Sequence, residues 1–213
     1  MAKIKLGDKM DINELQKLNK IYNYKTDKLG APSSLFLGTD YSDAYIHHFL
    51  PLKNKIKVFF EIGVAYGGSL EMWSDFFSDS LIVGMDIKSG YIPTRKNSVI
   101  EIGDATNPNF IKQMISKYGN PDITLDDGSH LSSQMKKSFE IIYPYTNMIY
   151  CIEDLGTQYN SFSEGRFIDD GISMMNDLFK LIHKNNEYPH NDYDYKQLCF
   201  SKYQCYIYKK WIL

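Results

Sequence analysis

Acidic side chains cluster directly after two apolar segments in the second half of the chain. Asp126, Asp127 and His130 follow one of these segments, and Glu153 and Asp154 follow the next. Four carboxylates brought together repel each other unless a cation lies between them. A hard divalent ion such as Mg²⁺ prefers these oxygen ligands, so the grouping favours a metal site with an imidazole beside it. Helix capping or binding of a backbone amide would explain only one or two of the four acids. The alternative for His130 is that it is a buried histidine of the hydrophobic core.

A glycine-rich turn follows an earlier apolar segment, at residues 61–69 (EIGVAYGGS). Glycines allow a ligand to approach the backbone closely. The dinucleotide fingerprint G-x-G-x-x-G is absent, because Ala65 stands where its second glycine would be. Glu61 would repel a pyrophosphate and suits a ligand with a cationic end. Asp86 closes the next apolar segment, where an acid can accept hydrogen bonds from both hydroxyls of a ribose.

A sheet is needed to bring these residues together, and the sequence alternates between strand-like and helix-like segments. The expected strands are 57–62, 81–85, 98–102, 122–125, 148–152, 198–200 and 204–208. The expected helices are 11–20, 42–50, 67–77, 108–118, 132–142 and 168–184, the last with Ile172, Met175, Phe179 and Ile182 facing inward. This α/β alternation predicts a mostly parallel sheet with helices on both faces and an antiparallel strand pair at the end. Ligands of such sheets bind beyond the carboxyl ends of the strands, where all the acids above fall.

Composition limits the class of protein. The chain has 213 residues, 43% apolar and 15% aromatic, with a net charge of −2. These values exclude intrinsic disorder and predict a single domain over residues 1–213, with residues 1–55 as an N-terminal helical cap region. No apolar run reaches the length of a membrane span and no signal-peptide core is visible, so a soluble, cytoplasmic protein without a membrane partner is expected.

Cysteine and charge content exclude further classes. Cys151, Cys199 and Cys205 are odd in number and show no C-x-x-C spacing, so we expect buried thiols rather than disulfides or a zinc site. The nearly balanced charge offers no basic stripe, which disfavours a nucleic-acid partner.

The EIGVAYGGS loop and Asp86 together resemble the first two motifs of class I S-adenosylmethionine-dependent methyltransferases. The resemblance implies a Rossmann-like fold with a seven-stranded sheet. It also implies that the glycine loop binds the amino-acid part of the cofactor, that Asp86 binds its ribose, and that residues 103–105 flank its adenine. The cofactor-binding residues so implied are Glu61, Gly63, Tyr66, Gly67, Gly68, Ser69, Asp86, Asp104 and Asp126.

The combination of EIGVAYGGS, DDGSH and IEDL resembles a narrower group, the sugar O-methyltransferases of the macrocin and mycinamicin type, with cephalosporin hydroxylase-like relatives. The resemblance runs from residues 24–28 (YKTDK) to the C-terminal strands. It implies that Asp127, Glu153 and Asp154 hold the metal, and that His130 is the catalytic base beside Asp127. The chain differs from this group in its short N-terminus and in the sequence of its loop at 156–167. The identity of the acceptor is therefore left open.

The expected activity is therefore methylation of a sugar hydroxyl, with S-adenosylmethionine and Mg²⁺ as cofactors and a nucleotide sugar, glycan or glycosylated natural product as partner. The loop at 156–167, with Tyr159, Phe162 and Arg166, either closes over the acceptor or is a solvated surface loop. Formation of a homo-oligomer is left open.

Two alternatives remain. An NAD-dependent oxidoreductase or epimerase is disfavoured, because neither G-x-G-x-x-G nor a suitably placed Y-x-x-x-K dyad is present. A non-catalytic binding module of the same fold is disfavoured by the intact set of Glu61, Asp86, Asp127 and His130.

Overall fold

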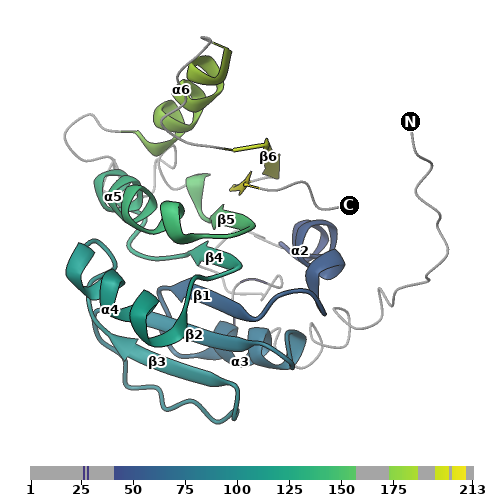
Figure 1. The fold of residues 1–213 in the computed structure, drawn as a ribbon, viewed down its shortest axis with the longest axis vertical. Helices are drawn as coiled ribbons and strands as arrows, with labels where there is room; N and C mark the ends of the chain where they lie inside the picture. Colours follow the sequence, from purple (N-terminus) through teal and green to yellow (C-terminus); the bar gives the residue numbers. More distant parts are fainter. Residues whose placement is uncertain are drawn as a thin grey trace, which may run out of the picture.

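The structure, a computed structural model, describes Thr26, Lys28 and residues 41–156, 173–186, 195–201 and 203–209, with the backbone alone for residues 181–186. These residues form a seven-stranded sheet of order β3-β2-β1-β4-β5-β7-β6 (Figure 1). The strands are β1 (Val58–Ile62), β2 (Leu81–Asp86), β3 (Ser98–Ile102), β4 (Ile123–Asp126), β5 (Ile149–Ile152), β6 (Gln197–Ser201) and β7 (Gln204–Tyr208). The first five strands run parallel, and β7 is antiparallel to both β5 and β6. The predicted mostly parallel sheet with an antiparallel end is confirmed, and each expected strand lies within one residue of its observed ends.

Helices cover both faces of the sheet (Figure 1). They are α2 (Ser42–Phe49), α3 (Gly68–Phe76), α4 (Pro108–Tyr118), α5 (Ser132–Ile142) and α6 (Met174–Asn186), with short 3-10 turns η1 (Leu50–Leu52) and η2 (Tyr143–Tyr145). The expected helix at 11–20 lies outside the described residues. None of the helices in the described part of the chain is long and apolar enough to cross a membrane.

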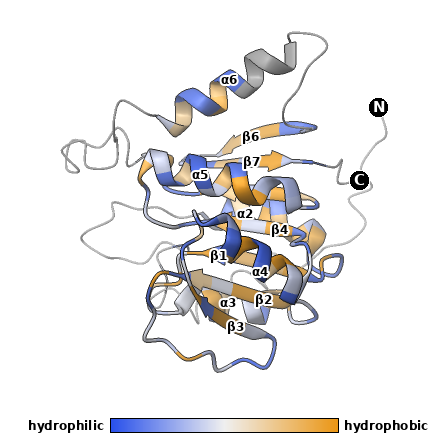
Figure 2. Ribbon diagram, turned by 60° about the vertical axis from the view of Figure 1, so that its left-hand side comes forward, coloured by the Kyte–Doolittle hydropathy of each residue, from blue (hydrophilic) through white to orange (hydrophobic). Residues whose placement is uncertain are grey.

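Two hydrophobic cores lie on the two faces of the sheet. Because successive strand residues point to opposite faces, Phe59 packs with Trp73 in the core beneath α2 and α3, whereas Phe60 packs with Phe139 in the core beneath α4 and α5. The central strands are accordingly apolar (Figure 2). Cys151, Cys199 and Cys205 are free thiols, as predicted. Cys151 and Cys205 are buried, whereas Cys199, which was also expected to be buried, is partly exposed.

The parallel register places the loops that carry the predicted site at one edge of the sheet. Ile62 of β1 pairs with Asp126 of β4, which in turn pairs with Ile152 of β5. The residues that follow these three positions, Gly63, Asp127 and Glu153, therefore leave the sheet side by side. This arrangement confirms the expectation that the acidic loops and the glycine loop meet at the carboxyl ends of the strands.

The start predicted for the helix at 168–184 was wrong. Residues 168–172 lie outside the described part of the chain, and Ser173 precedes the helix rather than belonging to it. Its hydroxyl accepts a hydrogen bond from the backbone N–H of Asn176 (3.4 Å), which is an N-cap contact. The helix therefore begins at Met174, where the cap satisfies an amide that has no partner inside the helix.

The prediction of which side chains of this helix face inward was also wrong in part. Met174 and Leu178 are buried, whereas Phe179 is 46% exposed. The ring of Phe179 stacks instead on Phe200 of β6, at the outer end of the sheet. Ile172 and the side chain of Ile182 lie outside the described part.

Candidate active site

A cavity of about 640 Å³ opens at the carboxyl edge of β1, β2 and β4. Most of the predicted cofactor-binding residues line it, namely Gly63, Tyr66, Gly68, Ser69, Asp86, Asp104 and Asp126. Glu61 and Gly67 are not among its lining residues, while Asp127 and Thr26 are. The cavity therefore connects the glycine loop with the first acidic loop.

Two glycines of the loop are required by neighbouring protein atoms. Gly63 has φ +85°, and a Cβ there would lie 2.2 Å from the backbone carbonyl oxygen of Asp127. Gly67 has φ +80°, and a Cβ there would lie 2.2 Å from the ring of Tyr91. We expected these glycines to let a ligand approach the backbone. Gly63 lines the cavity, and it also makes room for the acidic loop.

Asp86 fastens the glycine loop to the end of β2. Its Oδ2 accepts hydrogen bonds from the backbone N–H groups of Val64 (2.9 Å) and Ala65 (3.1 Å). Its Oδ1 accepts one from the backbone N–H of Lys88 (3.1 Å). A carboxylate offers about four acceptor sites, so the side chain retains capacity for a ligand in the cavity that it lines.

Other residues around the cavity differ in how firmly the protein holds them. Asp104 accepts hydrogen bonds from both the backbone N–H and the hydroxyl of Thr106 (2.8 Å each). Asp126 is buried and accepts hydrogen bonds from the hydroxyls of Ser138 (2.5 Å) and Tyr150 (2.9 Å). Tyr66, in contrast, is 94% exposed at the mouth of the cavity.

Glu61 is fully buried behind the glycine loop. Among the described residues, neither carboxylate oxygen of Glu61 meets hydrogen-bond geometry, nor does the indole N–H of Trp73. Burial raises the pKa of Glu61 to about 7, against the opposing influence of the Lys28 ammonium, the Ser69 hydroxyl and the Trp73 indole close by. Its assignment to the cofactor stays a prediction.

The raised pKa of Glu61 predicts a pH-dependent stability. The unfolded chain releases this proton near pH 4.5 and the folded protein near 7, so stability is lost as pH rises through that window. Glu61→Gln should therefore raise the melting temperature at pH 8 by several degrees, the effect of roughly 3 kcal/mol, and change it little at pH 5. Thermal unfolding of the cofactor-free protein measures this, with the exposed Glu140→Gln as control. An equal shift of the melting temperature at both pH values would contradict the raised pKa of Glu61.

Asp127, His130 and Asp154 form a group that suits a cation. One ligand atom from each residue lies within 4.8 Å of the others, and His130 Nε2 is 3.5 Å from Asp154 Oδ2. His130 (φ 58°) and Asp154 (φ 54°) both adopt left-handed backbone conformations, as does Ala65 (φ 46°) in the glycine loop. Such conformations cost energy in residues other than glycine and concentrate at functional sites.

Glu153 lies deeper than this group and is held by three donors. Its Oε1 accepts hydrogen bonds from the Tyr45 hydroxyl and from Gln204 Nε2 (2.8 Å), and its Oε2 accepts one from Lys28 Nζ (2.7 Å). Burial raises the pKa of Glu153, and the Lys28 ammonium opposes this shift. Lys28 Nζ also lies 2.5 Å from Asp127 Oδ2, so both carboxylates converge on one cationic group.

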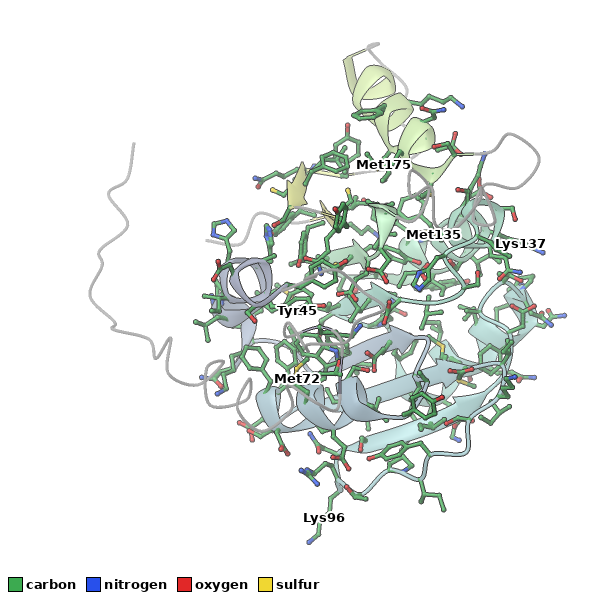
Figure 3. All side chains as sticks on the ribbon, turned by 180° about the vertical axis from the view of Figure 1, so that it is seen from behind. Tyr45, Met72, Lys96, Met135, Lys137 and Met175 are labelled. Carbon is green, nitrogen blue, oxygen red and sulfur yellow. The ribbon has the colours of Figure 1, made fainter. Side chains whose placement is uncertain are left out.

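Helix α2 supplies two tyrosines to consecutive carboxylates. Tyr41, which precedes the helix, donates to Asp154 Oδ1 (2.5 Å), and Tyr45 donates to Glu153. Burial and the nearby carboxylates raise the pKa of both hydroxyls, so they stay protonated as donors. Figure 3 shows Tyr45 within the molecule, while Lys137 of α5 points outward.

Sequence reasoning missed Lys28, Tyr41, Tyr45 and Gln204 as parts of the site. The available signal was the spacing of Tyr41, just before the expected helix, and Tyr45 in its first turn. Lys28 fell within the YKTDK segment but received no role. Tyr159, Phe162 and Arg166 of the predicted closing loop lie outside the described residues.

The seven-stranded sheet, with its antiparallel end, has the fold of class I methyltransferases. A structure of the MycE methyltransferase from the mycinamycin biosynthetic pathway, in complex with Mg, S-adenosylhomocysteine and mycinamycin VI, matches with a TM-score of 0.76 and 28% identity, over 91% of this chain and 52% of that one. No protein-family model matches the sequence.

Part of the chain is similar in sequence to curated sugar O-methyltransferases. The 8-demethyl-8-alpha-L-rhamnosyl tetracenomycin-C 2'-O-methyltransferase of Streptomyces olivaceus is 33% identical over 162 residues, 70% of this chain and 42% of that protein. Demethylmacrocin O-methyltransferase of Streptomyces fradiae is 34% identical over 160 residues, 71% of this chain and 38% of that protein. The chain thus spans about two fifths of the length of these relatives.

Proposed function

We propose that the protein transfers the methyl group of S-adenosylmethionine to a sugar hydroxyl, with the help of Mg²⁺. One observation carries this proposal: Asp127 lines the cavity and also belongs to the group with His130 and Asp154. A methyl donor in the cavity would therefore lie beside the residues that can bind and deprotonate an acceptor.

The cavity residues suit the two ends of the donor. Asp86 and Asp104 offer carboxylates to the nucleoside, and Gly68 and Ser69 bring the N-terminus of α3 into the lining. A helix N-terminus attracts a carboxylate such as that of the donor's methionine part. The acidic surroundings favour its cationic sulfonium.

The donor set fits a magnesium ion. We assign the metal to Asp127, Glu153 and Asp154, because hard cations prefer carboxylate oxygens. The Lys28 ammonium forms ion pairs with oxygens of both Asp127 and Glu153, which supports the proposal that these two side chains share a cation. A carboxylate oxygen of Asp154 lies within 4.8 Å of one of Asp127.

His130 is assigned as the base. When bound, Mg²⁺ would supply a positive charge that stabilises the developing charge on the acceptor oxygen. His130 then removes the hydroxyl proton, a task for which imidazole is suited near neutral pH. The Asp154 carboxylate, 3.5 Å from His130 Nε2, stabilises the imidazolium that results. The protein must also hold the acceptor oxygen in line with the sulfonium methyl.

The acceptor we propose is a sugar attached to a small-molecule aglycone. The names of the curated relatives describe transfer to such glycosides, for example the rhamnosyl group of a tetracenomycin. We further propose a single domain with residues 1–55 as its cap, a cytoplasmic location, and neither nucleic acid nor membrane as partner.

Calorimetric titration tests the donor assignment directly. We expect S-adenosylmethionine and S-adenosylhomocysteine to bind with a stoichiometry of one, and NAD to give no heat of binding. Binding of NAD alone would support the oxidoreductase alternative. Binding of the donor without turnover of any glycoside would favour the non-catalytic module.

Asp86→Ala should weaken the binding of S-adenosylmethionine by about 2 to 4 kcal/mol, because charge-assisted hydrogen bonds to the ribose are lost. The loss corresponds to about 30- to 1000-fold in dissociation constant, and it includes loosening of the glycine loop that Asp86 holds. Asp79→Ala, which removes an exposed carboxylate between α3 and β2, is the matched control. Unchanged affinity of Asp86→Ala would place the ribose elsewhere.

A further inference from the structure

Lys28 is a buried lysine in the acidic part of the site. Its side chain is 1% exposed, and no other lysine or arginine among the described residues is buried. Its ammonium lies 2.5 Å from Asp127 Oδ2 and 2.7 Å from Glu153 Oε2. An ammonium is taken out of water at a cost of several kcal/mol, so such a position requires the two carboxylates as partners.

The backbone fixes Lys28 from both sides. Its N–H donates to the Thr26 hydroxyl (3.3 Å), and its carbonyl oxygen accepts a hydrogen bond from the N–H of Tyr41 (3.1 Å). Thr26 also lines the donor cavity. The short segment that carries Lys28 thus connects the cavity wall, the start of α2 and the acidic group.

The carboxylates need this cation whenever no metal is present. Asp127 and Glu153 follow paired strand ends, and Asp154 lies next to them. Tyr41, Tyr45 and Gln204 donate hydrogen bonds to these acids but carry no charge. Without Lys28, the like charges would repel each other in a poorly solvated place.

We propose that Lys28 is a resident counter-cation and positioning residue, which holds Asp127 and Glu153 in place before Mg²⁺ binds. The role for Mg²⁺ rests on the proposed function, whereas the pairing of Lys28 with Glu153 does not. Lys28 contacts the two carboxylates and is not among the residues that line the cavity, so it acts through the carboxylates.

Melting temperatures in excess chelator and in saturating Mg²⁺ test this proposal. Lys28→Met should lower the melting temperature in chelator by roughly 6 to 15 °C, the usual effect of breaking a buried ion pair. Mg²⁺ should then stabilise Lys28→Met more than it stabilises the wild type, because the metal replaces the missing charge. The control is Lys117→Met, which removes an ion pair of similar length, 2.6 Å to Glu101, from a lysine that is 59% exposed. It should shift the melting temperature by about 2 °C or less.

The double variant Lys28→Met/Glu153→Gln keeps the proposal testable if the single variant does not fold. In chelator the double variant should melt at a higher temperature than Lys28→Met, or fold where Lys28→Met does not, since no unpaired carboxylate stays at Glu153. A double variant no more stable than Lys28→Met, or a Lys28→Met protein as stable as Lys117→Met, would overturn the role of Lys28. A further outcome is that the double variant regains stability in chelator while Mg²⁺ stabilises none of the proteins. That result would support Lys28 as the counter-cation of Glu153 and would overturn the proposal that it holds the carboxylates for Mg²⁺.

Discussion

Replacing His130 with alanine is expected to slow methyl transfer by about 10²- to 10⁴-fold, the usual contribution of a positioned base. The acceptor hydroxyl must lose its proton as the new bond forms, and His130 lies beside Asp127, which lines the donor cavity. Donor affinity should change little, because His130 is not among the lining residues. Single-turnover rates with a saturating glycoside, together with donor titration, measure both quantities.

Two variants separate chemistry from folding at this position. His130 has φ 58°, a conformation that asparagine tolerates better than alanine, so His130→Asn tests the missing base with less backbone strain. His47→Ala removes an exposed histidine from α2 and should leave the rate unchanged. Added imidazole should recover part of the rate of His130→Ala. If His130→Asn retains most of the wild-type rate, His130 is a positioning residue and not the base.

Removal of divalent metal is expected to abolish methyl transfer while donor binding survives. Asp127, Glu153 and Asp154 lie on the loops after β4 and β5, whereas most of the donor cavity belongs to the ends of β1, β2 and β3. Dialysis against chelator, followed by rate measurements and donor titration with and without Mg²⁺, tests the separation. Asp154→Asn should increase the Mg²⁺ concentration needed for half-maximal rate by at least about tenfold, since it weakens one proposed ligand.

Asp177→Asn provides the matched control for this metal dependence. Asp177 lies on α6 and forms ion pairs with Lys136 and Lys180, outside the acidic group. Its substitution should leave the Mg²⁺ requirement unchanged. Full activity in excess chelator would remove the metal from the mechanism and leave the acids as hydrogen-bond acceptors.

The sheet and the meeting of its loops could be predicted from sequence because both follow from local patterns. Short apolar runs separated by amphipathic segments specify parallel strands, and parallel strands bring their carboxyl ends to one edge. The proximity of Gly63 and Asp127 is a consequence of the pairing of Ile62 with Asp126. Asp86 and Asp104 line the cavity for the same reason.

The partners of the acids could not be predicted, because they come from distant parts of the chain. A lysine in a polar segment normally lies in solvent, and nothing near Lys28 in the sequence indicates burial against Glu153. Gln204 and Tyr45 reach the same carboxylate from β7 and α2, a convergence that depends on the tertiary fold. The raised pKa of Glu61 likewise results from surrounding atoms and not from its motif.

Methyl transfer from S-adenosylmethionine to a sugar hydroxyl is the activity that we propose for this chain. Its most direct test is incubation with a donor that carries an isotopically labelled methyl group, Mg²⁺ and a panel of deoxysugar glycosides, followed by fragment mass spectrometry. The labelled methyl group should appear on the sugar fragment of at least one glycoside, with an equal amount of S-adenosylhomocysteine, and should be absent with His130→Ala over the same time. Label on the aglycone alone, or labelled product from His130→Ala at the wild-type rate, would contradict this account.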